Sequence, residues 1–137
     1  MRHKFLVTAA AATTATHLIA THLPSETAAK LLFGIGGGSI NELIHFAVYF
    51  LSATLWWFAY TDRHRTASIK YQLVTFVPPL AALAFADEIT QPAFGRSAEL
   101  IDFLADLAGI VAGICSAIVV KNFFAISYRK PQPVGRP

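Results

Sequence analysis

Carboxylates gather in one short stretch of this 137-residue chain. Five of its eight Asp and Glu residues fall within 86–106, namely Asp87, Glu88, Glu99, Asp102 and Asp106, and Arg96 is the one Lys or Arg among them. Such residues are costly inside membrane segments and tend to be functional there. Because the stretch joins two apolar runs, we expect a polar site at the ends of membrane helices, with Glu42 brought near by another helix.

These residue types suit acid–base chemistry on a bound anion. His45 would serve as general acid or base, with Glu88 or Asp87 orienting its ring. Arg96 would hold a phosphate or carboxylate through two parallel hydrogen bonds. The predicted catalytic residues are therefore His45, Asp87 and Glu88. The predicted substrate-binding residues are Arg96, Gln91, Tyr49, Asp102 and Asp106.

Two other interpretations of these residues stay open. In the first, Arg96 bridges Asp87, Glu88 and Asp102 in an internal ion network that only locks the outer loops. In the second, His45 and carboxylates bind a metal ion. A single available histidine matches no strong metal pattern, so we expect no metal and no cofactor.

The segments that would position this site are strongly apolar. The chain is 55% hydrophobic and 14% charged, whereas soluble domains are about 25% charged. A membrane helix needs about 20 mostly apolar residues. We therefore predict an all-α integral membrane bundle of four transmembrane helices, at about 5–22, 43–60, 71–91 and 99–126.

The basic residues predict how these helices are oriented. Nine of the eleven Lys and Arg residues fall at the two termini or in the loop 61–70, and only Lys30 and Arg96 fall between the other helix ends. By the positive-inside rule, both termini are cytoplasmic and the polar site faces out of the plasma membrane. The cations stay near helix ends and form no stripe, so we expect no nucleic-acid partner.

Two ends of the chain need separate interpretation. Residues 1–127 form the predicted membrane domain, and residues 128–137 are a basic, proline-rich tail for which we expect no ordered structure. The segment 5–22 also fits a signal peptide, because a basic start precedes an apolar run and small residues. Both interpretations of this segment remain open on its local sequence.

Helical periodicity places polar residues on one face of the second span. Asn41, His45, Tyr49, Ser52 and Trp56 recur at spacings of four, four, three and four, so they share a face. Trp56, Trp57 and Tyr60 stand at the inner end, which is typical of an aromatic belt.

Small and special residues shape the last two spans. Gly109 and Gly113 share a face with Asp102 and Asp106, and a GxxxG step lets helices approach closely. Pro78 and Pro79 would bend the third span, either aiming Asp87 and Glu88 inward or only setting packing geometry. Ser97 is the predicted N-cap of the fourth span.

As an ordered set, these motifs resemble the VanZ-like family, named for a teicoplanin-resistance protein. The resemblance covers about 41–113 and rests on His45-Phe46 with Tyr49, Asp87-Glu88-Ile89-Thr90-Gln91, Gly95-Arg96-Ser97, Asp102 and Gly109. Two positions depart from the pattern: Asn41-Glu42 replaces Asp-Lys, and Asp106 replaces Asn. These changes alter the charge balance of the site. The resemblance favours a first helix that is kept rather than cleaved.

The resemblance implies a bacterial membrane protein linked to glycopeptide antibiotic resistance. We therefore expect a site that binds or modifies a cell-envelope or lipid-linked substrate, surrounded by membrane lipids. One alternative is a small proton-coupled transporter that uses Asp106 and His45 as a relay; another is a structural assembly factor. A transporter predicts a polar path continuing inward, whereas a surface site predicts polar residues confined to the outer third.

Overall fold

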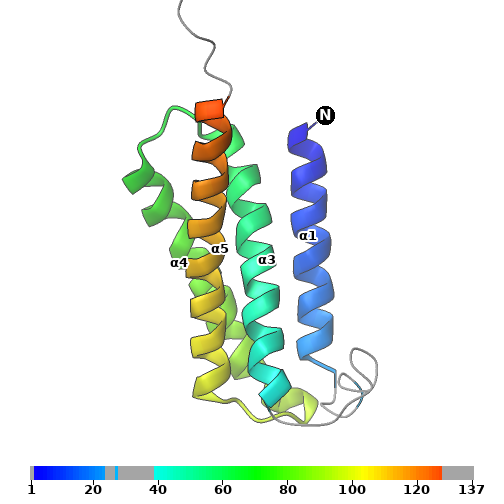
Figure 1. The fold of residues 1–137 in the computed structure, drawn as a ribbon. Coiled ribbons are helices and arrows are strands. Elements are labelled where there is room, and N and C mark those ends of the chain that lie inside the picture. The colour runs from blue at the N-terminus through cyan, green and yellow to red at the C-terminus, as the bar shows by residue number, and fades with distance from the viewer. Residues whose placement is uncertain (1, 24–26, 28–38, 128–137) are drawn as a thin grey trace, which may run out of the picture.

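The computed structural model describes residues 2–23, 27 and 39–127, and every regular element among them is helical. Four long helices occur in the order α1 (Arg2–Thr21), α3 (Ser39–Arg63), α4 (Ile69–Thr90) and α5 (Leu100–Ser127), with a short 3-10 helix, η1 (Gln91–Phe94), between α4 and α5 (Figure 1). The all-α prediction is confirmed. The predicted tail 128–137 lies outside the described residues.

Three of these helices are long and apolar enough to cross a membrane. They cover Asn41–Arg63, Ile69–Phe94 and Leu100–Phe124. The remaining predicted span, 5–22, coincides with α1, which is a helix but is not among these three. Repeated threonines, together with His3 and His17, lower the hydropathy of α1 below that of the other helices.

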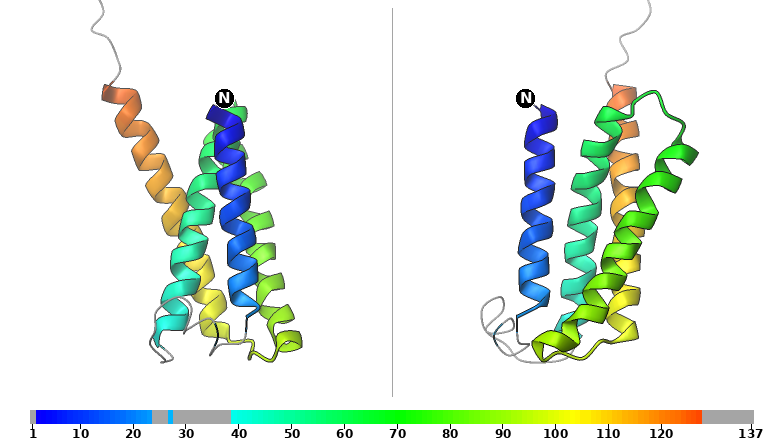
Figure 2. Two further views of the ribbon diagram at one scale, coloured as in Figure 1. Left: turned by 90° about the vertical axis from the view of Figure 1, so that its right-hand side faces the viewer. Right: turned by 180° about the vertical axis from the view of Figure 1, so that it is seen from behind.

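The helices alternate in direction, so polar segments far apart in the sequence meet at one end of the bundle. Figure 2 shows the C-terminal end of α1, the N-terminal ends of α3 and α5, and η1 together at that end. We call it the site end. The start of α1, the α3–α4 turn and the end of α5 lie at the opposite end. α3 is the central helix and packs on both α5 and α1.

Two glycines bring α5 into backbone contact with α3. A Cβ atom at Gly109 would collide with the carbonyl oxygen of Phe46, and one at Gly113 would collide with that of Phe50. The Thr54 hydroxyl donates across the interface to the Gly113 carbonyl at 3.2 Å. The predicted close approach along the GxxxG face is confirmed.

Away from the site end, an apolar core fills the interior of the bundle. Trp57 is 1% exposed and packs edge-on against Phe76 at 5.1 Å between ring centroids, with Leu80 and Ile114 in the same cluster. The aromatic-belt interpretation is therefore wrong for Trp57, because its ring is a core side chain. Trp56 donates its indole N–H to Thr14 of α1 at 2.9 Å.

The α4–α5 connection reverses the chain within a few residues. α4 continues through Pro78 and Pro79 to Thr90, and Gly95 then adopts a left-handed conformation, φ 77°, that costs glycine little. The predicted N-cap role of Ser97 is wrong, since its hydroxyl donates to the Glu99 carboxylate at 2.7 Å. The Glu99 carbonyl accepts the first helical hydrogen bond, from Asp102 N–H at 3.0 Å.

Replacing Gly109 with alanine tests the backbone contact. Because the added methyl must push α5 away from Phe46, we expect Gly109→Ala to destabilise the bundle by about 1–3 kcal/mol, as overpacking does. Val111→Ala is the matched control, because Val111 is exposed on the same helix. Thermal unfolding in detergent measures both variants, and equal melting temperatures would contradict the close contact.

Candidate functional site

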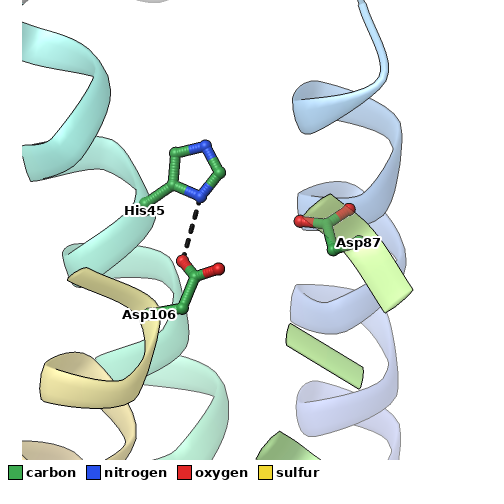
Figure 3. A group of neighbouring side chains, drawn as sticks. All are labelled: His45, Asp87 and Asp106. Carbon is green, nitrogen blue, oxygen red and sulfur yellow. Dashed lines mark hydrogen bonds and ion pairs between the residues drawn. The ribbon is translucent and has the colours of Figure 1, made fainter. Parts of the chain in front are cut away.

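One buried imidazole joins side chains from three helices at the site end. His45 of α3 is 1% exposed, and its Nδ1 atom lies 2.9 Å from Asp106 Oδ1 of α5 (Figure 3). The same nitrogen lies 3.8 Å from Glu88 Oε1 of α4, and Nε2 lies 3.7 Å from Asp102 Oδ2. The predicted convergence of these four residues is what the structure shows.

Two of the neighbouring carboxylates are held by the turns around them. Glu88 Oε2 accepts the backbone N–H of Glu99 at 3.0 Å, and Glu88 Oε1 lies 3.4 Å from the amide nitrogen of Gln91, which is fully buried. Asp102 Oδ2 accepts a hydrogen bond from Asn41 Nδ2. These contacts fix the α4–η1–α5 turn against the first turn of α3.

The fourth carboxylate, Asp87, is held mainly by α1. Thr21 donates its hydroxyl to Asp87 Oδ1 at 2.9 Å, and ring nitrogens of His17 and His22 lie 3.3 and 3.4 Å from the carboxylate. In Figure 3, Asp87 lies beside α1, across from the His45–Asp106 pair. Asp106, rather than Asp87, makes the hydrogen bond that orients His45.

Arg96 connects three segments of the chain at this end. Its guanidinium donates to the Thr21 carbonyl oxygen at 2.7 Å and to Asn41 Oδ1 at 2.8 Å. No carboxylate among the described residues lies within ion-pair distance of it, so the predicted network of Arg96 bridging carboxylates is wrong. Its predicted role in substrate binding stays a prediction, with its remaining N–H groups as the available donors.

Two residues of this cluster, Thr21 and His22, were missed by sequence reasoning. For His17, the sequence favours a hydrogen bond to a neighbouring helix over a ligand role, and its ring nitrogen lies 3.3 Å from Asp87 of α4. His17 and Thr21 are one turn apart, so their helical spacing is a signal that both face the same neighbour. Tyr49, a predicted site residue, lies one turn beyond His45 and packs edge-on against His17 at 4.6 Å between ring centroids.

The side chains of the cluster are almost fully buried, and some of their polar atoms have no hydrogen-bond partner. Asp87, Glu88, Asp102 and Asp106 are 2%, 5%, 1% and 0% exposed. Among the described residues, His45 Nε2, Asp102 Oδ1 and Asp106 Oδ2 have no hydrogen-bond partner. Buried polar atoms without partners are unusual in proteins. Such atoms are candidates for contact with a ligand.

The arrangement supports acid–base chemistry and cation binding. The hydrogen bond to Asp106 places the proton of a neutral imidazole on Nδ1 and leaves a lone pair on Nε2. Two groups of residues, His45–Asp87–Asp106 and His45–Glu88–Asp102, each offer metal-ligand atoms within 4.8 Å of one another.

Fold and site together define a helical protein with three helices suited to a membrane and a buried histidine–carboxylate cluster at one end. Comparison with protein-family models, with curated proteins and with solved structures gave no match. The resemblance to VanZ-like proteins therefore rests on the motifs in the sequence alone.

Arg96 variants test the role of its two hydrogen bonds. Each hydrogen bond from a charged donor is worth about 1.5–3 kcal/mol, so Arg96→Ala should lower the free energy of unfolding by several times the effect of Arg65→Ala. The free energy of unfolding of Arg96→Lys should lie between those of the wild type and Arg96→Ala, because an ammonium group lacks the planar donor geometry of a guanidinium group.

Arg65 is the matched control for this experiment. Its side chain is 70% exposed and pairs with Asp62, three residues earlier in the chain, and such surface pairs contribute about 0–1 kcal/mol. Unfolding in detergent is the measurement. If Arg96→Ala and Arg65→Ala unfold alike, Arg96 does not join the three segments.

Proposed function

We propose that this chain is a VanZ-like plasma-membrane protein whose site end binds a lipid-linked or cell-envelope substrate and uses His45 as acid–base group on it. The buried hydrogen bond between His45 and Asp106, 2.9 Å long, carries the proposal. A carboxylate on one ring nitrogen orients the imidazole and stabilises its protonated form. The other nitrogen is then the one that exchanges a proton with substrate.

The surroundings of the cluster favour a substrate with an apolar chain. Exposed apolar side chains lie at the same end of the helices, namely Leu43, Ile89, Phe94, Leu100 and Ile101. In a bilayer these side chains contact lipid tails. A lipid-linked molecule would place its acyl or prenyl chain against them and its polar group at His45 and Arg96.

The apolar core favours a surface site over a transport path. Tyr49 and Ser52 extend polar character inward from His45, and their buried hydroxyls lack hydrogen-bond partners among the described residues. Beyond them, Trp57, Phe76 and Ile114 fill the bundle with buried apolar side chains. A proton relay from His45 and Asp106 would have to cross this core.

In the proposed topology α1 is a fourth span and is kept in the mature protein. It packs on α3 and supplies Thr21 to Asp87, so its removal would strip a donor from a buried carboxylate. Both termini are cytoplasmic in this arrangement, and the site end faces out of the membrane, where glycopeptide antibiotics act. A contribution to resistance against such antibiotics follows from the resemblance.

Analysis of copurifying lipids tests the proposed substrate. We expect a lipid-linked species to copurify with the wild type in detergent and to fall about tenfold, or ~1.4 kcal/mol, in His45→Gln, because one hydrogen bond to a charged group is lost. His64→Gln is the control, since His64 lies at the opposite end and stacks on Tyr60. Mass spectrometry at equal protein amounts is the measurement. Identical lipid profiles for all three proteins would reject the proposal.

Cysteine labelling tests the topology. The single cysteine, Cys115, is first replaced by alanine, and cysteines are then introduced at the exposed positions Thr66 and Ala98. An impermeant thiol reagent on intact cells should label Ala98→Cys and leave Thr66→Cys unlabelled until the membrane is permeabilised. Labelling of both from outside, or of Thr66→Cys alone, would contradict an outward site end.

A further inference from the structure

Two unsatisfied atoms lie on neighbouring side chains of the cluster. His45 Nε2 and Asp102 Oδ1 have no hydrogen-bond partner among the described residues, and both side chains are 1% exposed. His45 Nε2 lies 3.7 Å from the other carboxylate oxygen of Asp102, which is too long for a hydrogen bond. Nε2 thus has a carboxylate beside it but no hydrogen bond in the described part of the chain.

We infer that His45, Glu88 and Asp102 bind a divalent transition-metal ion of the Zn²⁺ or Mn²⁺ type. The inference rests on the proposed function, because it gives the same substrate site a cofactor. A ring nitrogen that binds a metal ion cannot also exchange a proton, so here the ion, by polarising the substrate, replaces the proton-transfer role proposed for His45 Nε2. The inference also changes the expectation from sequence, which was based on a single histidine without knowledge of how the carboxylates surround it.

The spacing of the three side chains suits one ion. Their ligand atoms all lie within 4.8 Å of one another, and the His45–Asp102 pair is 3.7 Å apart. Ligands about 2.0–2.2 Å from a tetrahedral ion stand roughly 3.3–3.6 Å from each other. Small rotations of the side chains would therefore close the site around an ion.

Asp106 is placed to accept a hydrogen bond from the metal-binding histidine without binding the metal itself. A histidine that binds a metal through one nitrogen usually donates its other N–H to a carboxylate or carbonyl, which fixes the ring. The 2.9 Å contact between His45 Nδ1 and Asp106 provides that hydrogen bond. This arrangement leaves Nε2 as the ligand atom.

The alternative group, His45 with Asp87 and Asp106, fits less well. Asp87 also has an oxygen without a hydrogen-bond partner, Oδ2, but among the described residues it makes no ion-pair contact with His45, whereas Glu88 and Asp102 lie 3.8 and 3.7 Å from its ring nitrogens. Asp106 already accepts a hydrogen bond from His45 Nδ1 through Oδ1, which is the role of an outer partner. Imidazole with carboxylates suits Zn²⁺, Mn²⁺ or Fe²⁺, whereas Mg²⁺ and Ca²⁺ favour oxygen ligands alone. Such an ion would polarise a phosphoryl or carbonyl oxygen of the substrate.

Metal titration of the full chain in detergent tests the inference. After chelator treatment, the wild type should bind one Zn²⁺ or Mn²⁺ per chain in equilibrium dialysis followed by elemental analysis, in preference to Mg²⁺. Asp102→Asn should weaken binding at least about 10-fold, and Asp106→Asn about 10–100-fold, as loss of outer partners does. Asp62→Asn is the control and should bind within about threefold of the wild type, because Asp62 lies at the other end of α3 and is not a ligand.

Each result decides the matter. Absence of saturable binding by the wild type overturns the inference, as does equal affinity of Asp102→Asn and Asp62→Asn. Loss of binding in Asp87→Asn with retention in Asp102→Asn overturns this ligand set. Glu88→Gln provides the same comparison if Asp102→Asn does not fold, with melting temperatures in chelator as the folding check.

The copurification experiment separates this inference from the proposed function. Metal binding without a copurifying lipid-linked species would leave the metal site standing and reject the function. If a lipid-linked species copurifies in a way that depends on His45, but the chain binds no metal, the proposed function stands and the metal site is rejected.

Discussion

Four carboxylates buried at one end of a helical bundle set the main physical constraint on this protein. A buried carboxylate without a donor or cation is strongly destabilising, and water is scarce where the helices enter lipid. The surrounding structure supplies what they need: the His45 ring, the Thr21 hydroxyl, the Asn41 amide and the backbone N–H of Glu99. These donors come from α1, α3 and the turn before α5, so satisfying the carboxylates fixes how these segments meet.

Packing and chemistry are linked through α5. Gly109 lies three residues after Asp106 on the same face, and its missing side chain lets α5 touch the backbone of α3 at Phe46. Phe46 is next to His45 in sequence. The 2.9 Å contact between His45 and Asp106 therefore depends on a glycine that takes no part in it, because a wider helix separation would move the carboxylate out of reach.

Spacing within a helix was readable from the sequence, whereas pairing between helices was only partly so. The periodicity of α3 correctly placed His45 and Tyr49 on one buried face, and small residues predicted the approach of α5. Alternation of direction placed the carboxylates at one end.

The partners of Arg96 were missed because a backbone carbonyl, that of Thr21, leaves no trace in residue types. Trp57 was misassigned because interface and core tryptophans look alike in sequence. For His17, the sequence favoured a partner on a neighbouring helix but could not name Asp87, which is remote in the chain.

The polar attachment of α1 has a consequence for how the chain is made. Inside a bilayer, apolar side chains gain little free energy by moving from acyl tails to another helix. Helices therefore associate through packing and hydrogen bonds. Polar partners of α1 include Trp56 and Asp62 on α3, Asp87 at the end of α4, and Arg96 after η1. All of them are synthesised later than α1. α1 is thus synthesised before each of these partners, so its histidines and threonines can form these contacts only after α3, α4 and η1 have followed it.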